Sequence, residues 1–428
     1  MLTIFKNSGT GISTLNGTDR WNSRLVRPLT GLTALLAVLP LLATAQESTE
    51  FRASAQIEQN SNVFYLPNAS FLSTPYVGKA LGSMVQVYTG EIAPKYQWED
   101  QSLTARFLAR DLKYSEFSDL NHTEYLAQIG LGWQLTPRFH GNLEAARERR
   151  LVRYEEVLTS TLLVEKETRA KGDFTFDLTS QWRIDGLLKT RQDDSPRPQA
   201  SDLRVHENSA QVGFKFSQNG DIYTGLSGEY VQGNFQGLGG LLTNPTIGVV
   251  DFHRSTIQAV VERTQRDNDI LKAALGYTSN YLNNGLSTFN VLSGEAGYKR
   301  SLTGKTVLDI VLSRGVSAYL SSAGVAVDTK ARAGVSWQAT SKIDVSAGLG
   351  YTRSTIPGWN LVTSGVSVVG ASLSDRQDKI KQEYLEVVYN PLRPVSLRPY
   401  VRHEARDSNI ATFQYTDTIY GAQFTITF

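Results

Sequence analysis

Charged side chains at alternate positions are the residues of this sequence that could do chemistry. Side chains two positions apart lie on the same face of a β-strand, so this spacing builds one polar surface from several strands. Such a surface can pair its own charges across neighbouring strands, or it can bind anionic or hydroxyl-rich solutes. For any single residue we favour the first interpretation, and both remain open. The polar contacts predicted in this way are Arg106, Arg110, Glu144, Arg183, Asp185, Lys272 and Arg332.

Enzymatic and metal chemistry have much weaker support. The chain has 5 His, 2 Met and no Cys, and no histidine lies in an H-E-x-x-H motif. No G-x-S-x-G elbow is present, and Gly237–Gly240 lacks the Lys-Ser/Thr of a phosphate loop. A formal net charge of +2 argues against a nucleic-acid partner. We therefore predict no catalytic residues, no cofactor and no metal site, and hence a protein that is not an enzyme.

The end of the chain indicates where the polar surface belongs. Tyr420, Ala422, Phe424, Ile426 and Phe428 alternate with small or polar residues, so the last strand has one apolar, aromatic face. A chain that ends on such a strand resembles bacterial outer-membrane barrel proteins. In those proteins the closing strand is the signal for the barrel-assembly machinery. The resemblance implies that role for Tyr420, Phe424 and Phe428, with the machinery as a partner.

The same alternation recurs along the whole chain and predicts about eighteen strands. One example is Ile343–Tyr351, where the apolar residues alternate with Asp344 and Ser346. Short turns such as Thr136–Arg138 alternate with long Gly/Ser/Asn/Pro-rich links such as Gln232–Phe252 and Ser354–Asp378. We predict an all-β fold, a transmembrane antiparallel up-and-down β-barrel, with the polar surface facing its lumen. The alternative is a soluble β-solenoid or sandwich.

The N-terminal region reads as an export signal. Basic residues precede the apolar run Leu29–Leu42, and Ala43-Thr44-Ala45 follows it. That run is too short to span a bilayer as a helix, so we favour a cleavable signal peptide over a retained anchor. The predicted organisation is a signal peptide at 1–45 and an outer-membrane barrel at 46–428. The predicted location is the bacterial outer membrane, with its lipid as a partner.

Three Ser-Asn pairs lie where predicted strands meet external loops. They are Ser61-Asn62, Ser279-Asn280 and Ser408-Asn409, and Asn is favoured there because it tolerates turn geometry. As a set, with Phe64, Tyr65 and the aromatic last strand, they resemble the porin-like outer-membrane barrels of exosortase-associated exopolysaccharide operons. The resemblance implies passage of polysaccharide, with periplasmic and inner-membrane export components as partners.

These observations lead to one predicted function and two alternatives. The prediction is an outer-membrane channel that exports exopolysaccharide from the periplasm to the cell surface. The first alternative is a general or substrate-specific uptake porin of the same fold. The second is an enzyme at the barrel rim that acts on polysaccharide or lipid and would use residues such as His206 or Glu144.

Overall fold

The computed structural model describes most of the chain after residue 45. The described residues are 46–72, 76–152, 154, 160–196, 203–236, 249–265, 269–282, 289–319, 324–356 and 375–428. The predicted signal peptide lies outside them, as do Gly237–Gly240 and most of the link Ser354–Asp378. Among the described residues, no helix is long and apolar enough to cross a membrane.

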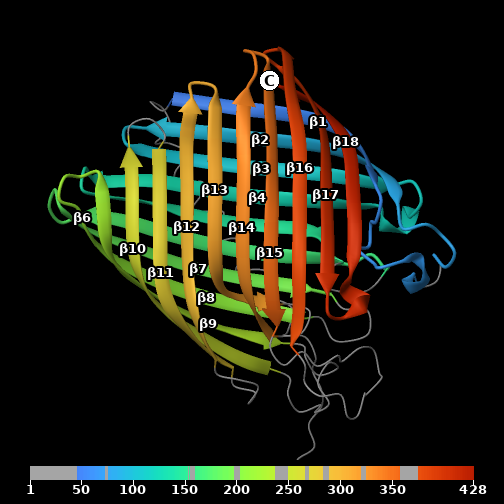
Figure 1. Cartoon of the computed structure of the whole chain (residues 1–428). Helices are drawn as coiled ribbons and strands as arrows, with labels where there is room; N and C mark the ends of the chain where they lie inside the picture. The colour runs from blue at the N-terminus through green and yellow to red at the C-terminus, as the bar shows by residue number, and fades with distance from the viewer. Residues whose placement is uncertain are drawn as a thin grey trace, which may run out of the picture. The chain divides into compact units, whose positions relative to one another are not determined.

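Long strands account for nearly all of this structure (Figure 1). Each of them exceeds the ordinary strand length of about six residues, as a tilted span of a bilayer requires. The strands are β1 (Gln46–Asn60), β2 (Ser83–Trp98), β3 (Gln101–Tyr114), β4 (His122–Thr136), β5 (Phe139–Leu151), β6 (Val164–Asp177), β7 (Trp182–Ser195), β8 (Leu203–Phe216), β9 (Ile222–Gln236), β10 (Val249–Gln265), β11 (Asp269–Leu282), β12 (Phe289–Thr303), β13 (Thr306–Tyr319), β14 (Gly324–Gln338), β15 (Ile343–Ile356), β16 (Arg376–Leu392), β17 (Val395–Ser408) and β18 (Tyr415–Thr427). Short 3₁₀ turns within the described links include η2 (Ala69–Phe71), η3 (Ser118–Leu120) and η6 (Ala411–Phe413).

The strands form one closed antiparallel barrel. The described residues give an 18-stranded sheet in which strands adjacent in sequence pair with each other, and β1 pairs with β2. The ring closes where β1 pairs with β18, from Arg52 opposite Thr427 to Asn60 opposite Ile419. Closure leaves no unpaired sheet edge, which is the condition for spanning lipid with strands. The predicted fold and strand number are confirmed.

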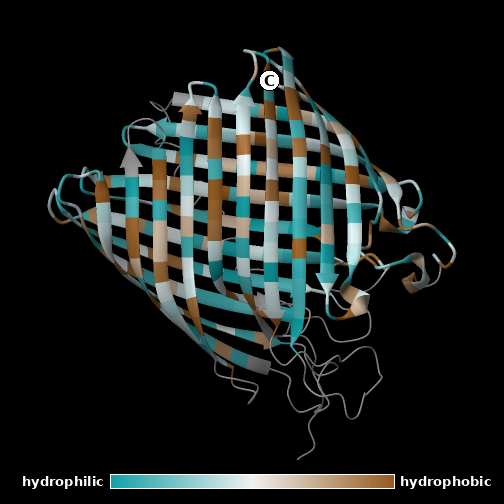
Figure 2. Cartoon of the chain, viewed as in Figure 1, coloured by the Kyte–Doolittle hydropathy of each residue, from teal (hydrophilic) through white to brown (hydrophobic). Residues whose placement is uncertain are grey.

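The two faces of the wall differ in polarity, and the strand register decides which residues share a face. Leu226 on β9 is opposite Phe214 on β8 and Ala259 on β10, while the next residue, Ser227, is opposite Gly213 and Gln258. The apolar side chains of this face are widely exposed, among them Leu226, Ile257 and Leu275. Figure 2 shows the resulting alternation of hydrophobic and hydrophilic residues along each strand. The apolar face is the outer one, because only it can be solvated by lipid.

Aromatic residues gather on the outer face beside the short turns. Trp182, Trp337 and Tyr389 are all exposed there. Trp182 stacks on Phe214 with ring centroids 4.8 Å apart, and Trp133 packs edge-on against Phe139 at 5.0 Å. Aromatic girdles of this kind border the lipid-facing band of outer-membrane barrels. The protein is an outer-membrane β-barrel.

Two prolines lie inside strands, where a missing N–H would normally interrupt the ladder. Pro94 falls between the pairs Ile92–Phe107 and Lys95–Thr104, in a gap of the β2–β3 ladder. Pro399 pairs with Ala422 on β18, and the β16–β17 ladder skips it between Tyr400 and Leu397. Each proline therefore occupies a local gap, and both strands continue through it.

The links that follow β1, β3 and β5 pack into a small hydrophobic core, called here the mouth core. Phe64 is fully buried, with Phe117 at 4.8 Å and Tyr154 at 5.3 Å between ring centroids. These rings pack against the inner-face residues Val85 and Val87 of β2, so the loops fold inward over the lumen. The members of the mouth core are Val63, Phe64, Leu66, Leu72, Tyr76, Val85, Val87, Tyr114, Phe117, Leu120 and Tyr154.

Polar contacts fasten the mouth core as well. The Tyr76 hydroxyl donates to the Asp119 carboxylate at 3.2 Å. Burial, together with that carboxylate, raises the pKa of Tyr76 to about 12, so the hydroxyl stays protonated and keeps donating. The Asn62 amide bonds to both the N–H and the C=O of Leu66, so it closes its own turn. Asn409 instead accepts from the Gln377 N–H of β16, so it ties the end of β17 to the neighbouring strand.

Candidate functional site: the lumenal wall

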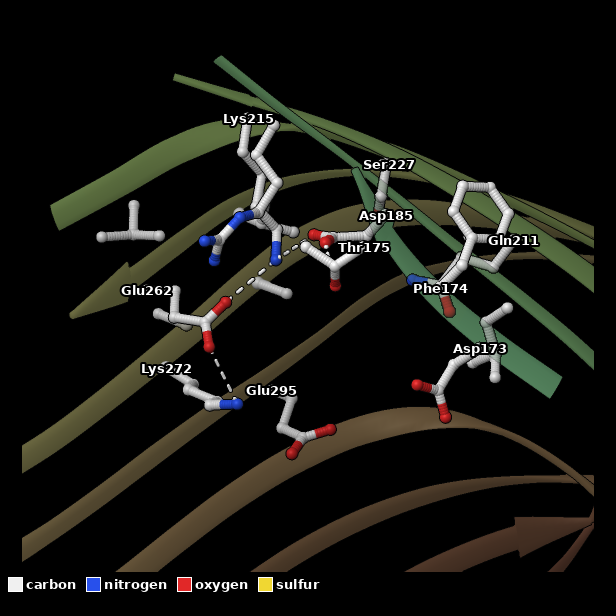
Figure 3. Close-up of a pocket in the computed structure, with 18 of the residues that line it drawn as sticks. Asp173, Phe174, Thr175, Asp185, Gln211, Lys215, Ser227, Glu262, Lys272 and Glu295 are labelled. Carbon is white, nitrogen blue, oxygen red and sulfur yellow. Dashed lines mark hydrogen bonds and ion pairs between the residues drawn. The ribbon is translucent and has the colours of Figure 1, made fainter. Parts of the chain in front are cut away.

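A chain of four charged residues crosses the inner wall from β7 to β11. The Lys215 Nζ lies 2.7 Å from the Asp185 carboxylate and 2.9 Å from the Glu262 carboxylate. Glu262 also pairs with Lys272 at 2.9 Å. Figure 3 shows Lys215 and Lys272 reaching Glu262 from two sides, in a hollow of about 610 Å³. We call these four residues the lysine-carboxylate chain. Its charges balance, two against two.

A glycine allows this chain to cross β9, which contributes none of its charges. Lys215 on β8 is in register with Gly225, and Gly225 is in register with Val260 on β10. A Cβ at Gly225 would lie 2.1 Å from the Phe214 carbonyl oxygen and 2.8 Å from the Lys215 Cα. Any side chain there would push the two strands apart. The bare backbone lets Lys215 extend over β9 to Glu262.

Replacing Lys215 by alanine is expected to lower the free energy of unfolding by about 1–3 kcal/mol. The change leaves the Asp185 and Glu262 carboxylates facing each other without their shared cation, and all three side chains are largely covered by protein. Urea unfolding in lipid vesicles, followed by gel mobility, measures the difference. Lys272→Ala is the matched control, because Lys272 has one partner and is 62% exposed; its expected cost is below about 1 kcal/mol. Equal costs for both variants would contradict the bridging role of Lys215.

A second network lies toward the outer ends of β5, β6 and β7. Arg150 contacts Glu165 at 2.6 Å and Glu167 at 3.2 Å, and Glu167 also accepts from Arg169 at 2.9 Å and Arg191 at 3.4 Å. Glu165 and Glu167 are buried. Together these pairs neutralise a densely charged stretch of the inner wall. The charged runs around Arg150 and Glu167 are therefore part of a packed network.

The residues predicted as lumenal contacts all lie at inner-face positions, but the structure does not bring them into one site. Arg106 pairs with Glu91 at 2.9 Å, and Arg110 with Glu124 at 3.7 Å. Arg332 lies 3.7 Å from Asp309 across the β13–β14 pair. Each of these predicted basic residues therefore has a carboxylate partner. Whether they contact solute stays a prediction.

The other four predicted residues belong to the lysine-carboxylate chain, lie beside it or lie farther along the wall. Asp185 and Lys272 belong to the chain itself. Arg183 is beside it, pairs with Asp177 at 2.7 Å and stacks on the Tyr223 ring at 4.4 Å. Glu144 is opposite Gly130 and Lys171, and no ion pair involving it occurs among the described residues.

Lys215, Glu262 and Glu91 were not among the predicted contacts. The alternation of side chains along each strand could have identified all three, because it places each of them on the inner face. Lys215 alternates with Phe214 and Phe216, and Glu262 is two positions from Val260 on the inner face. Their joining across an intervening strand depends on Gly225, which parity alone does not reveal.

Tyrosines form a second inner-wall feature on β16–β18. The Tyr384 ring lies over Gly348 of β15, where a Cβ would come within 2.4 Å of the ring, and Tyr384 remains 40% exposed. Tyr400 lies over Gly421 in the same way, with the Arg402 guanidinium 4.8 Å from its ring centroid. Tyr384 borders a hollow of about 460 Å³ whose other lining residues include Tyr65, Gln382, Glu386, Arg402, Glu404 and Asp417. We call this hollow the tyrosine strip.

The histidines do not assemble with carboxylates into a catalytic arrangement among the described residues. His206 is in register with Gln192 and Asn234 on the outer face, while Glu144 is on the inner face. The two residues considered for a rim enzyme thus lie on opposite sides of the wall. His122 is buried, 2.6 Å from the Leu120 carbonyl and 3.3 Å from Glu124. No cluster of three or more potential metal ligands occurs in the described part of the chain.

No protein-family model and no curated protein matches this sequence. Solved structures resemble its fold. The Pseudomonas aeruginosa protein OccK2 (OpdF), determined with glucuronate, is 9% identical with a TM-score of 0.45, covering 89% of this chain and 98% of its own. OpdK, an outer-membrane protein of the same organism, is 9% identical with a TM-score of 0.45, covering 89% of this chain and 99% of its own. The siderophore receptor PirA of Acinetobacter baumannii is 7% identical with a TM-score of 0.44, covering 90% of this chain and 81% of its own. Similarity at this level says nothing of what the chain binds.

Proposed function

We propose that this barrel is an outer-membrane channel that exports exopolysaccharide from the periplasm to the cell surface. The observation that supports it best is the tyrosine strip, where the partly exposed ring of Tyr384 lies beside amide, carboxylate and guanidinium groups. A flat aromatic face accepts the apolar face of a sugar ring, and the surrounding groups can hydrogen-bond its hydroxyls.

The charge pairing of the wall supports a solute that is handled through hydroxyl groups. The five predicted basic residues have carboxylate partners, so these cations are not available to hold an anion tightly. A polymer in transit needs many weak contacts rather than one strong site, because each bound unit must also leave. Weak contacts with hydroxyl groups would also suit the uptake of small hydrophilic solutes. The experiment below distinguishes polymer export from solute uptake.

In a strain that lacks the gene, polymer is expected to accumulate in the periplasm while its synthesis continues. Complementation with Tyr384→Ala should restore clearly less surface polymer than the wild-type chain, because the exposed ring at the strip is gone. Tyr351→Ala is the matched control. The exposed fraction of Tyr351, 39%, is close to the 40% of Tyr384, but Tyr351 lies on the outer face. Surface polymer and periplasmic polymer are quantified separately. Normal secretion by the deletion strain would refute export and favour the uptake porin, for which single-channel conductance is the next measurement.

A further inference from the structure

Four basic residues form a row on the outer face near the external ends of β13–β16. Arg314 is opposite Thr329, Thr329 is opposite Arg353, and Arg353 is opposite Lys379, in one continuous register across four strands. Lys381 follows Lys379 on the same face. All four bases are exposed. They share strand parity with the exposed residues Leu312, Leu349 and Tyr351, so they belong to the outer surface and not to the lumen. We call these four residues the basic row.

The basic row places like charges directly opposite each other. Arg353 and Lys379 are cross-strand partners, an arrangement that costs free energy unless a counter-charge is present. Two carboxylates share this face: Asp407 is in register with Lys379, and Glu383 is two positions from Lys381. Neither forms an ion pair with the row, and within the described ranges Arg353, Lys379 and Lys381 have no ion-pair partner. Arg314 donates to the Thr329 hydroxyl, at 2.9 Å.

The height of the row identifies what can supply the counter-charge. Lys379 is separated from the girdle residue Tyr389 by about ten residues, which is the length a tilted strand needs to cross the apolar core of a bilayer. The row therefore lies at the outer edge of the lipid-facing band, at the depth of lipid headgroups.

A second pair shows the same arrangement elsewhere on the barrel. Arg149 on β5 is directly opposite Lys166 on β6, and Lys166 is about ten residues from Phe176, an exposed aromatic at the opposite end of its strand. Lys166 also faces Asp194, which pairs instead with Arg204 at 3.2 Å. Two opposed pairs of basic residues thus lie at the same height on different parts of the barrel. This repetition favours a role that involves the surrounding membrane over a chance feature of one strand.

We propose that the basic row binds phosphate groups on the headgroups of the outer-leaflet lipid. Arg353 presents a guanidinium that can hold a phosphate through two parallel hydrogen bonds, and the two lysines add compact charges beside it. A bound phosphate removes the repulsion between Arg353 and Lys379. Juxtamembrane bases of this kind are attracted to anionic headgroups because the surface potential acts on each charge. The proposal is independent of what passes through the lumen.

The test uses the detergent-purified mature chain and two defined lipids: bisphosphorylated lipid A and the same lipid without its phosphates. Native mass spectrometry counts the lipids retained by each barrel. The wild-type protein is expected to prefer the phosphorylated lipid by about tenfold or more, and R353Q/K379Q/K381Q is expected to lose that preference. The control R138Q/K305Q/R393Q removes the same charge from exposed positions in the short turns at the other end and should retain it.

Equal retention of the two lipids by the wild-type protein would overturn the proposal. So would an unchanged preference in the row variant, or an equal loss in both triple variants. Heat-dependent mobility in gels verifies that each variant is a folded barrel. If the row variant does not assemble, Arg353→Gln alone gives the same reading, because it removes the bidentate donor and one half of the opposed pair.

Discussion

Truncation of the chain after Gln414 is expected to eliminate the folded barrel. It removes β18, which pairs on one side with β17 and on the other with β1. Without it, the edges of β17 and β1 that faced β18 present unpaired N–H and C=O groups to lipid, at several kcal/mol for each group. No rearrangement of one side chain can offset that loss. The measurement is heat-dependent gel mobility of the membrane fraction, where the truncated chain should migrate identically whether boiled or not.

A full-length variant separates strand pairing from recognition of the aromatic face. Y420S/F424S/F428S keeps every backbone bond of β18 but removes the predicted assembly signal. The control Q423S/T425S/T427S changes the alternate positions of the same strand. If the outer-face variant inserts as well as its control in cells, the predicted role of Tyr420, Phe424 and Phe428 is wrong. A truncated chain that still gave a heat-modifiable band would contradict the requirement for closure.

Phe64→Ala should loosen the mouth core while the barrel itself stays folded. Phe64 is fully buried among the rings of Tyr76, Phe117 and Tyr154, so its removal costs the loops about 3–5 kcal/mol of packing. Because the mouth core covers part of the inner face of β2 and β3, its release should widen the outer entrance. Single-channel recordings in planar bilayers are expected to show higher and noisier conductance than the wild-type protein.

Phe107→Ala is the control for this effect. Phe107 is an exposed outer-face residue of β3, so its loss removes the same ring without touching the loops. Limited proteolysis gives a second reading, with faster cleavage near residues 61–72 expected only for Phe64→Ala. Wild-type conductance together with a wild-type cleavage pattern would show that the mouth core does not restrict the entrance.

The barrel could be predicted from the sequence because period-two alternation is a local property that survives in every strand. Asp185 and Arg183 are on the inner face for the same reason that Ile184 is on the outer one. The lysine-carboxylate chain could not be predicted, since it requires Gly225 to be aligned with Lys215 and Val260 across three strands. Alignment of that kind depends on the shear of the whole barrel.

The mouth core and the tyrosine strip escaped prediction for a different reason. Phe64, Phe117 and Tyr154 come from three separate loops, and loops have no periodicity from which their contacts could be read. Tyr384 looks like an interruption of its strand's polar face until Gly348 is found beneath the ring. The two prolines can be explained from the sequence. Proline cannot donate a ladder hydrogen bond, and a ladder leaves a gap at both Pro94 and Pro399.

The pairing of β1 with β18 has a kinetic consequence. Arg52 pairs with Thr427, so the contact that completes the ring joins the first and the last strands of the barrel. Contacts of such high sequence separation form late, because the chain loses the entropy of closing a long loop before the paired strands contribute favourable free energy. Until that moment both terminal strands of the nascent sheet expose edges that can pair with other chains. Folding of this protein therefore has a vulnerable interval that lasts until its last residues arrive.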